Sequence, residues 1–187
     1  DRVVTVDLHA GQIQGFFDIP VDNLFATPIF ARHARKKIKS KKIICVAPDV
    51  GGTERARALG KLLGAGLAIV DKRRPKPGQS KVMNVIGDVK DQTCIIVDDI
   101  IDSGGTIVNA AKALKERGAK EVYVYITHGV LSGDAVKKIK SSVIKNLVIT
   151  DTIDNGVKIK NVKNIEVLPI SSLMGEAIKR ISNSTSV

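Results

Sequence analysis

The chain has 187 residues, of which 43% are hydrophobic and 3% aromatic, and its formal net charge is +11. This length suits one domain with an appendage from a second, and the composition excludes a disordered chain and predicts an aliphatic core. Basic residues gather at 35–42, 72–76 and 137–145 without interleaved aromatics, which is typical of solvated faces, so we expect no nucleic acid partner.

Short apolar runs alternate with amphipathic patterns from one end of the chain to the other. A helix is predicted to begin at Thr27, because a capping residue is followed there by Pro28. Strands are predicted at 3–6, 43–47, 67–70, 94–97, 122–126 and 147–149, and further helices at 53–63, 106–117, 134–139 and 171–181. This alternation favours an α/β fold in which helices cover both faces of a parallel sheet.

Residues 72–81 follow neither period and contain Pro75, Pro77 and Gly78 among charged residues. We expect a long polar loop there, of the kind that often serves as a lid.

Cysteines and apolar runs indicate where the protein resides. Cys45 and Cys94 each lie within an apolar run, which predicts buried thiols and no disulfide or metal site. The apolar runs are too short to span a membrane, and we find no signal peptide pattern. We therefore predict a cytoplasmic protein with no membrane partner.

The most informative pattern is an acidic strand end that is followed by a glycine turn and a helix. Asp98 and Asp99 come at the end of the strand, and the turn Asp102-Ser103-Gly104-Gly105-Thr106 leads into the helix. Backbone N–H groups of such a turn bind anions, whereas carboxylates accept hydrogen bonds from hydroxyls. A ligand with a phosphate at one end and vicinal hydroxyls at the other, such as ribose 5-phosphate, satisfies both. A turn that only caps the helix is the alternative, but a cap needs one Asp and this segment has three.

Two further segments carry groups suited to phosphate chemistry. Asp49, Gly51 and Gly52 follow the strand at 43–47 and could offer N–H groups to a diphosphate and an oxygen ligand to Mg²⁺, although an ordinary loop also fits. Lys72 and Arg74 begin the predicted polar loop, where cations could stabilise a transferring phosphoryl group. In isolation, that basic run is better explained as a solvated surface.

The chain resembles a known family along most of its length. Residues 97–106 resemble the phosphoribosyl pyrophosphate loop of type I phosphoribosyltransferase folds. Residues 7–22, which begin Asp7-Leu8-His9, resemble the signature of the ribose-phosphate pyrophosphokinases, also called phosphoribosyl pyrophosphate synthetases. Residues 71–75, 80–87, 125–129 and 150–153 are similar to the same family.

The resemblance implies a type I phosphoribosyltransferase-like fold and a set of site residues. Asp98 and Asp99 would bind the ribose hydroxyls, and residues 102–106 the 5-phosphate. His9 and Asp49 would bind the Mg²⁺ of MgATP, and the Asp49–Gly52 turn the diphosphate. Lys72 and Arg74 would be catalytic.

It also implies a reaction and an assembly. The family transfers the diphosphoryl group of MgATP to the C1 hydroxyl of ribose 5-phosphate, giving phosphoribosyl pyrophosphate and AMP, and its members form hexamers. Because they have two similar domains, we expect residues 1–25 to be a remnant of an N-terminal domain, 26–168 the C-terminal domain, and 169–187 a helix packing toward the missing domain. Upstream residues are then absent, and this chain could be inactive.

Two other functions stay open. A phosphoribosyltransferase would share residues 98–106 but gives no reason for the segment around His9. A non-catalytic regulatory homologue would be expected to lose Lys72, Arg74, His9 and Asp49, all of which are present.

Overall fold

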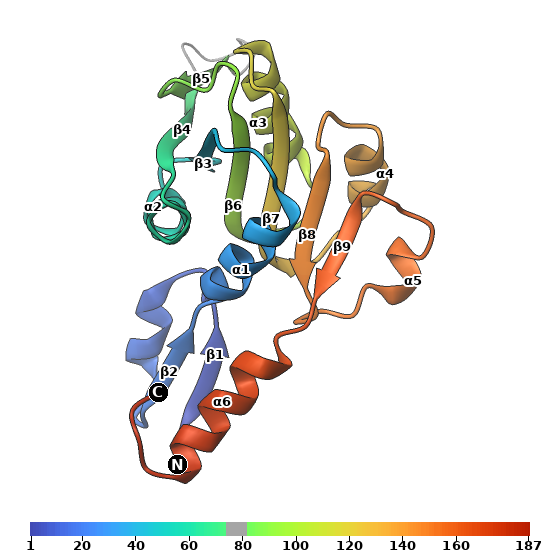
Figure 1. Cartoon of the computed structure of the whole chain (residues 1–187). Helices are drawn as coiled ribbons and strands as arrows, with labels where there is room; N and C mark the ends of the chain where they lie inside the picture. Colours follow the sequence, from blue (N-terminus) through green and yellow to red (C-terminus); the bar gives the residue numbers. More distant parts are fainter. Residues whose placement is uncertain (74–81) are drawn as a thin grey trace.

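A computed structural model describes residues 1–73 and 82–187 (Figure 1). Its main body is a seven-stranded sheet with the strand order β5-β4-β3-β6-β7-β8-β9. The strands are β3 (Ile43–Ala47), β4 (Gly66–Arg73), β5 (Val82–Ile86), β6 (Thr93–Ile101), β7 (Glu121–Gly129), β8 (Asn146–Thr150) and β9 (Ile165–Leu168). All neighbouring pairs are parallel except β4 and β5. The predicted α/β fold with a parallel sheet is confirmed, and the antiparallel edge strand β5 is an addition to it.

Helices cover both faces of this sheet, because its central strands are apolar on both sides. On one face, α1 (Thr27–Lys37) and α2 (Thr53–Leu63) bury residues such as Phe30 and Leu59 against the strands. On the other face, α3 (Gly105–Glu116) and α4 (Ala135–Lys140) do so with residues such as Leu114 and Ile139. The short helix α5 (Gly156–Ile159) precedes β9. No helix of residues 1–73 and 82–187 is long and apolar enough to cross a membrane.

The ends of the chain lie apart from this sheet. β1 (Val3–Val6) and β2 (Val21–Leu24) form a separate two-stranded parallel sheet, with the 3₁₀ helix η1 (Gly11–Phe16) between them in the chain. Helix α6 (Ser171–Ser182) leaves the body on the same side, where Figure 1 also shows both chain ends. The predicted boundaries at residues 25 and 168 fall between these parts, and the assignment of the end segments to a missing domain stays a prediction.

Five elements of the described residues were not predicted: η1, β2, β5, α5 and β9. Several predicted strands are longer than expected, among them β4, β6 and β7, the last of which runs on to Gly129. β4 continues to Arg73, into the segment that was predicted to be a loop, because its end pairs with the antiparallel β5. β6 continues to Ile101, because it pairs with β7 through Gly129. The two carboxylates that were expected after a strand therefore lie within one.

Burial of the two cysteines gives a first testable prediction. Cys45 and Cys94 are fully buried, and they belong to the core clusters on opposite faces of the sheet, so they cannot form a disulfide with each other. Burial raises the pKa of each thiol to about 12. We expect neither thiol to react with Ellman's reagent at pH 8 in the folded protein and both to react after denaturation. Rapid reaction of the folded protein would contradict this packing.

Candidate functional site

Asp98 and Asp99 form an acidic pair near the end of β6. Their side chains are 19% and 3% exposed. The backbone N–H of Asp99 donates to Asp98 Oδ1 at 3.0 Å, which ties the two residues together locally. Although successive side chains of a strand usually point to opposite faces, these two carboxylates share one partner on a neighbouring helix.

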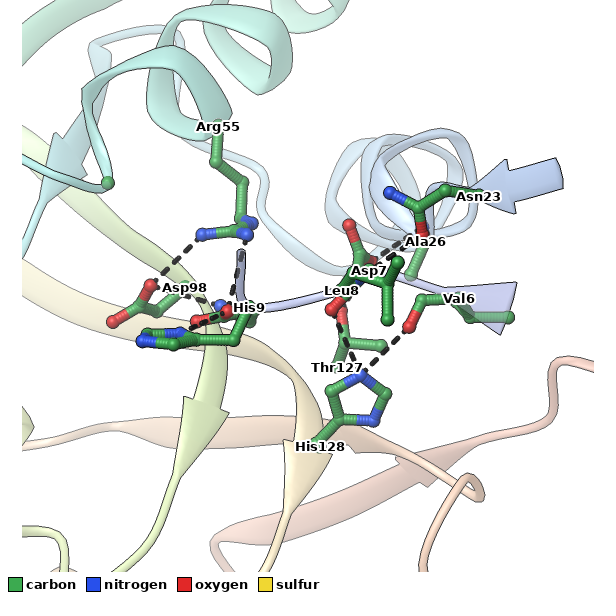
Figure 2. A network of polar contacts seen from close by, with 12 residues as sticks. Val6, Asp7, Leu8, His9, Asn23, Ala26, Arg55, Asp98, Thr127 and His128 are labelled. Carbon is green, nitrogen blue, oxygen red and sulfur yellow. Dashed lines mark hydrogen bonds and ion pairs between the residues drawn. The ribbon is translucent and has the colours of Figure 1, made fainter. Parts of the chain in front are cut away.

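Arg55 joins the two carboxylates from α2. Its Nη1 donates to Asp98 Oδ1 at 3.1 Å, and its Nη2 lies 3.5 Å from Asp99 Oδ2. Arg55 stands on the first turn of α2, directly after the Asp49–Gly52 turn. Arg55 therefore follows the turn predicted to bind a diphosphate and contacts the carboxylates predicted to bind ribose. Figure 2 shows it reaching toward Asp98 and His9.

His9 reaches the same acidic pair from the N-terminal segment. Its Nδ1 lies 2.8 Å from Asp99 Oδ2, a contact that spans 90 residues of sequence. The imidazole is otherwise open, because 79% of the His9 side chain is exposed. The structure thus brings three of the sequence segments together: the one around His9, the one around Arg55 and the acidic strand end.

Burial and mutual repulsion shift the acidity of the pair. Burial, followed by the charge of Asp99, raises the pKa of Asp98 to about 7. Burial would also raise the pKa of Asp99, but the hydrogen bond from His9 and the Arg55 charge outweigh it, so that this pKa lies below its usual value. The site therefore holds one strongly acidic and one weakly acidic carboxyl group side by side.

The glycine turn opens the N-terminus of α3. Gly104 adopts the left-handed conformation with φ +75° and precedes the first residue of the helix. No side chain caps this end, so the first N–H groups of α3 are available to a ligand. Asp102, Ser103 and Thr106 are exposed around the turn, and an ideal Cβ on Gly105 would meet nothing within 4 Å. This geometry suits a phosphate group.

The Asp49–Gly52 turn has a similar construction at the N-terminus of α2. The Gly52 N–H donates to Asp49 Oδ1 at 3.1 Å, and no side chain caps the helix. A Cβ on Gly51 would come within 3.3 Å of that same Oδ1, so the turn favours glycine. Asp49 itself is exposed.

Metal binding was predicted at His9 and Asp49. Within residues 1–73 and 82–187, no group of three or more His, Cys, Asp or Glu side chains is arranged to hold a metal ion. Mg²⁺ does not need such a group, because it commonly binds one or two carboxylates together with waters and substrate phosphates. An exposed carboxylate at a phosphate-type turn fits that mode of binding, and the role of the two residues stays a prediction.

The predicted catalytic pair lies at the margin of the described structure. Lys72 belongs to the end of β4, two strands away from β6 in the sheet. Arg74 lies outside the described residues.

Sequence patterns did not reveal how Arg55 is used. Its position beside the glycine turn was visible, but its two acidic partners lie more than 40 residues further along the chain. Asp7 and Thr127 lie in the stretches that resemble the family, but the hydrogen bond between them, which spans 120 residues of sequence, was also missed.

The chain is similar to a known family and to curated proteins over most or all of its length. The model of a family described as phosphoribosyl synthetase-associated domain matches residues 72–187. A ribose-phosphate pyrophosphokinase of Hyphomonas neptunium is 61% identical over 188 residues, and one of Haemophilus influenzae is 53% identical. These matches cover 100% of this chain, which spans 60% of the length of each relative.

Solved structures of other proteins also resemble this chain. The phosphoribosylpyrophosphate synthetase of Mycobacterium smegmatis superposes with a TM-score of 0.89 and 37% identity, over 98% of this chain and 59% of that one. An adenine phosphoribosyl transferase of Trypanosoma brucei matches with a TM-score of 0.51 and 14% identity, over 78% of this chain and 63% of that one, which is a likeness of fold alone.

Proposed function

Because this chain belongs to the phosphoribosyl synthetase-associated domain family, we propose that it is the ribose 5-phosphate-binding part of a ribose-phosphate pyrophosphokinase. The observation that carries the proposal is the convergence of His9, Arg55 and the Asp98–Asp99 pair beside the glycine turn of α3. The reaction would transfer the diphosphoryl group of MgATP to the C1 hydroxyl of ribose 5-phosphate, yielding phosphoribosyl pyrophosphate and AMP.

Each part of the site has a role suited to its chemistry. Asp98 and Asp99 accept hydrogen bonds from the ribose hydroxyls, and the N–H groups of residues 103–106 hold the 5-phosphate. This arrangement orients the C1 hydroxyl toward the β-phosphorus of ATP. The Asp49–Gly52 turn holds the diphosphate through its N–H groups.

Negative charge builds up on the oxygens of the diphosphate during the transfer, and nearby cations would stabilise it. Lys72 and Arg74 would supply two of them from the end of β4 and the segment that follows it. His9 and Asp49 would hold Mg²⁺, which neutralises negative charge on the phosphate oxygens when it is bound. A homo-oligomer and a cytoplasmic setting remain predictions.

A second prediction tests the reaction itself. We expect this chain to release AMP from MgATP only when ribose 5-phosphate is present, and Lys72→Ala to reduce that release by at least about 100-fold. Lys61→Ala, which changes an exposed lysine of α2, is the matched control and should retain activity. The measurement is AMP formation followed by chromatography.

Two other outcomes are informative. If the folded chain binds ribose 5-phosphate but releases no AMP, the chain is a sugar-phosphate binder, and the reaction requires the remaining length found in its relatives. If it neither binds the sugar phosphate nor releases AMP, the proposed function is wrong for this chain.

A further inference from the structure

Asp7 is a buried acidic residue that the proposed chemistry does not use. It is 1% exposed and has the left-handed φ of +47°, a conformation that is uncommon for residues other than glycine. A buried carboxylate in such a conformation is costly, and it persists only where the surrounding contacts hold it. These contacts indicate what Asp7 does.

The side chain of Asp7 joins the N-terminal segment to two other parts of the fold. Its Oδ2 accepts hydrogen bonds from the backbone N–H of Ala26, at the start of α1, and from Thr127 Oγ1 on β7, at 2.9 and 2.7 Å. Its Oδ1 has no hydrogen-bond partner among the described residues. One oxygen therefore makes both attachments, one of them to the N–H group at the start of α1.

His128 holds the backbone of the same segment. Its Nε2 lies 2.9 Å from the carbonyl oxygen of Val6 and 3.2 Å from that of Asp7. Since both partners can only accept, Nε2 must carry the hydrogen. The Asp7 side chain and the Asp7 carbonyl are thus fixed by consecutive residues of β7, Thr127 and His128 (Figure 2).

This attachment point lies beside Asp99 on the sheet. The β6–β7 register pairs Asp98 with Ile126 and Ile100 with His128, which sets Asp99 next to Thr127 on the neighbouring strand. Adjacent strands are about 5 Å apart, and two residues of extended chain reach roughly 7 Å. A segment fastened at Thr127 through Asp7 consequently brings the residue two positions later, His9, over Asp99.

We propose that Asp7, Thr127 and His128 are positioning residues that hold His9 against Asp99. The His9 side chain is 79% exposed, so packing does not hold its ring in place. Its single described side-chain contact, with Asp99, therefore depends on how the backbone before it is held. The proposal deepens the proposed function by assigning a support to one of its site residues, and it rests on that function for the significance of His9.

Three histidines make this proposal accessible to nuclear magnetic resonance, because the chain contains only His9, His33 and His128. Side-chain ¹H–¹⁵N correlations report the tautomer, the hydrogen bonding and the mobility of each ring. Asp99→Ala supplies the reference spectrum of a detached His9. His33 bonds to Tyr125 and Glu166 on another part of the sheet, so its unchanged signals verify the fold in every variant.

Four variants separate the contacts of Asp7 from its backbone conformation. Asp7→Gly tolerates a positive φ but lacks the acceptor, whereas Asp7→Asn tolerates that φ and can keep its oxygen on both donors. Thr127→Val removes one donor with little change of shape. His128→Gln removes the ring but keeps an N–H donor of similar reach on a more flexible side chain.

The expected result is loss of the His9–Asp99 signature in Asp7→Gly and Thr127→Val, with His9 at the positions seen in Asp99→Ala and His33 unchanged. Asp7→Asn should retain the native His9 signals, and His128→Gln should fall between. Native His9 signals in folded Asp7→Gly would overturn the proposal. If Asp7→Gly does not fold, Thr127→Val decides: native His9 signals there overturn the proposal as well.

The spectra are read without substrate, so they stand apart from the proposed reaction. Failure of the AMP assay with the His9 signals behaving as expected would refute the proposed function and leave the positioning role intact. If the chain is active but its His9 signals are unchanged in Asp7→Gly and Thr127→Val, the positioning role is refuted and the proposed function stands.

Discussion

Asp98→Asn is expected to stabilise the folded chain at pH 8 and, in the same variant, to weaken its binding of ribose 5-phosphate. Burial and the neighbouring Asp99 carboxylate raise the pKa of Asp98 to about 7. Asparagine has a similar shape, removes the charge and keeps an oxygen for Arg55 and the Asp99 N–H. The wild-type Asp98 carboxylate therefore lowers the free energy of unfolding at pH 8. We expect this residue to be kept for its part in binding ribose 5-phosphate.

The pH dependence of this cost follows from the direction of the pKa shift. Below about pH 4, Asp98 is protonated in both the folded and the unfolded chain, and the cost vanishes. As pH rises from about 4 to 7, the unfolded chain loses the proton while the folded chain retains it, so wild-type stability falls. Above about pH 7 the whole cost is present. The gain from Asp98→Asn should accordingly be absent at pH 4 and largest at pH 8.

Urea denaturation at several pH values measures this gain. We expect roughly 1–3 kcal/mol in the free energy of unfolding at pH 8, below what the full shift would give, because water screens part of it. Binding of ribose 5-phosphate should fall roughly 10- to 100-fold by calorimetry, since hydrogen bonds to a charged group are lost. Asp91→Asn, at an exposed turn position with φ +57°, is the control for removing a negative charge. A variant less stable than wild type at pH 8 would contradict the account.

Arg55→Met is expected to have the opposite effect on stability. Without the guanidinium, Asp98 and Asp99 face each other with no cation from α2, and an unpaired, largely buried charge is costly. We expect a loss of roughly 2–3 kcal/mol in the free energy of unfolding at pH 8, which shrinks on acidification as a carboxyl group takes up a proton.

A double variant distinguishes this explanation from loss of packing. Arg55→Met combined with Asp98→Asn should recover much of the loss, because only one carboxylate then remains. Arg57→Met changes an exposed arginine two residues later on the same helix, and it should alter stability by less than about 0.5 kcal/mol. If the double variant is as unstable as Arg55→Met alone, the repulsion between the carboxylates is not the cause.

The central part of the fold was predictable because its strands are continuous apolar runs. β3, β7 and β8 lie between covered faces, and their sequences consist largely of Val, Ile, Leu and Tyr. β9 is an edge strand with Glu166 inside it, and β2 contains Asp22 and Asn23, so neither shows that signal. β5 pairs antiparallel at the other edge and includes Asn84.

One part of the candidate site was likewise predictable from the sequence, and another part was not. The acidic strand end and the glycine turn of α3 lie within nine residues, and such a local pattern could be recognised directly. The contacts of Asp99 with His9 and of Asp98 with Arg55 depend on how distant segments meet above β6. The packing of α2 and of the N-terminal segment on the sheet decides those contacts, and it cannot be deduced from the residues of any one segment.

The binding of ribose 5-phosphate by this chain tests the central claim most directly. A titration of the ¹⁵N-labelled chain with ribose 5-phosphate, followed through its backbone amide signals, would locate the ligand. We predict saturable shifts in the amides of residues 98–99 and 103–107, which Asp98→Asn weakens, with smaller shifts near His9 and Arg55. No saturable shift, or shifts confined to other parts of the sheet, would contradict the assignment of this site.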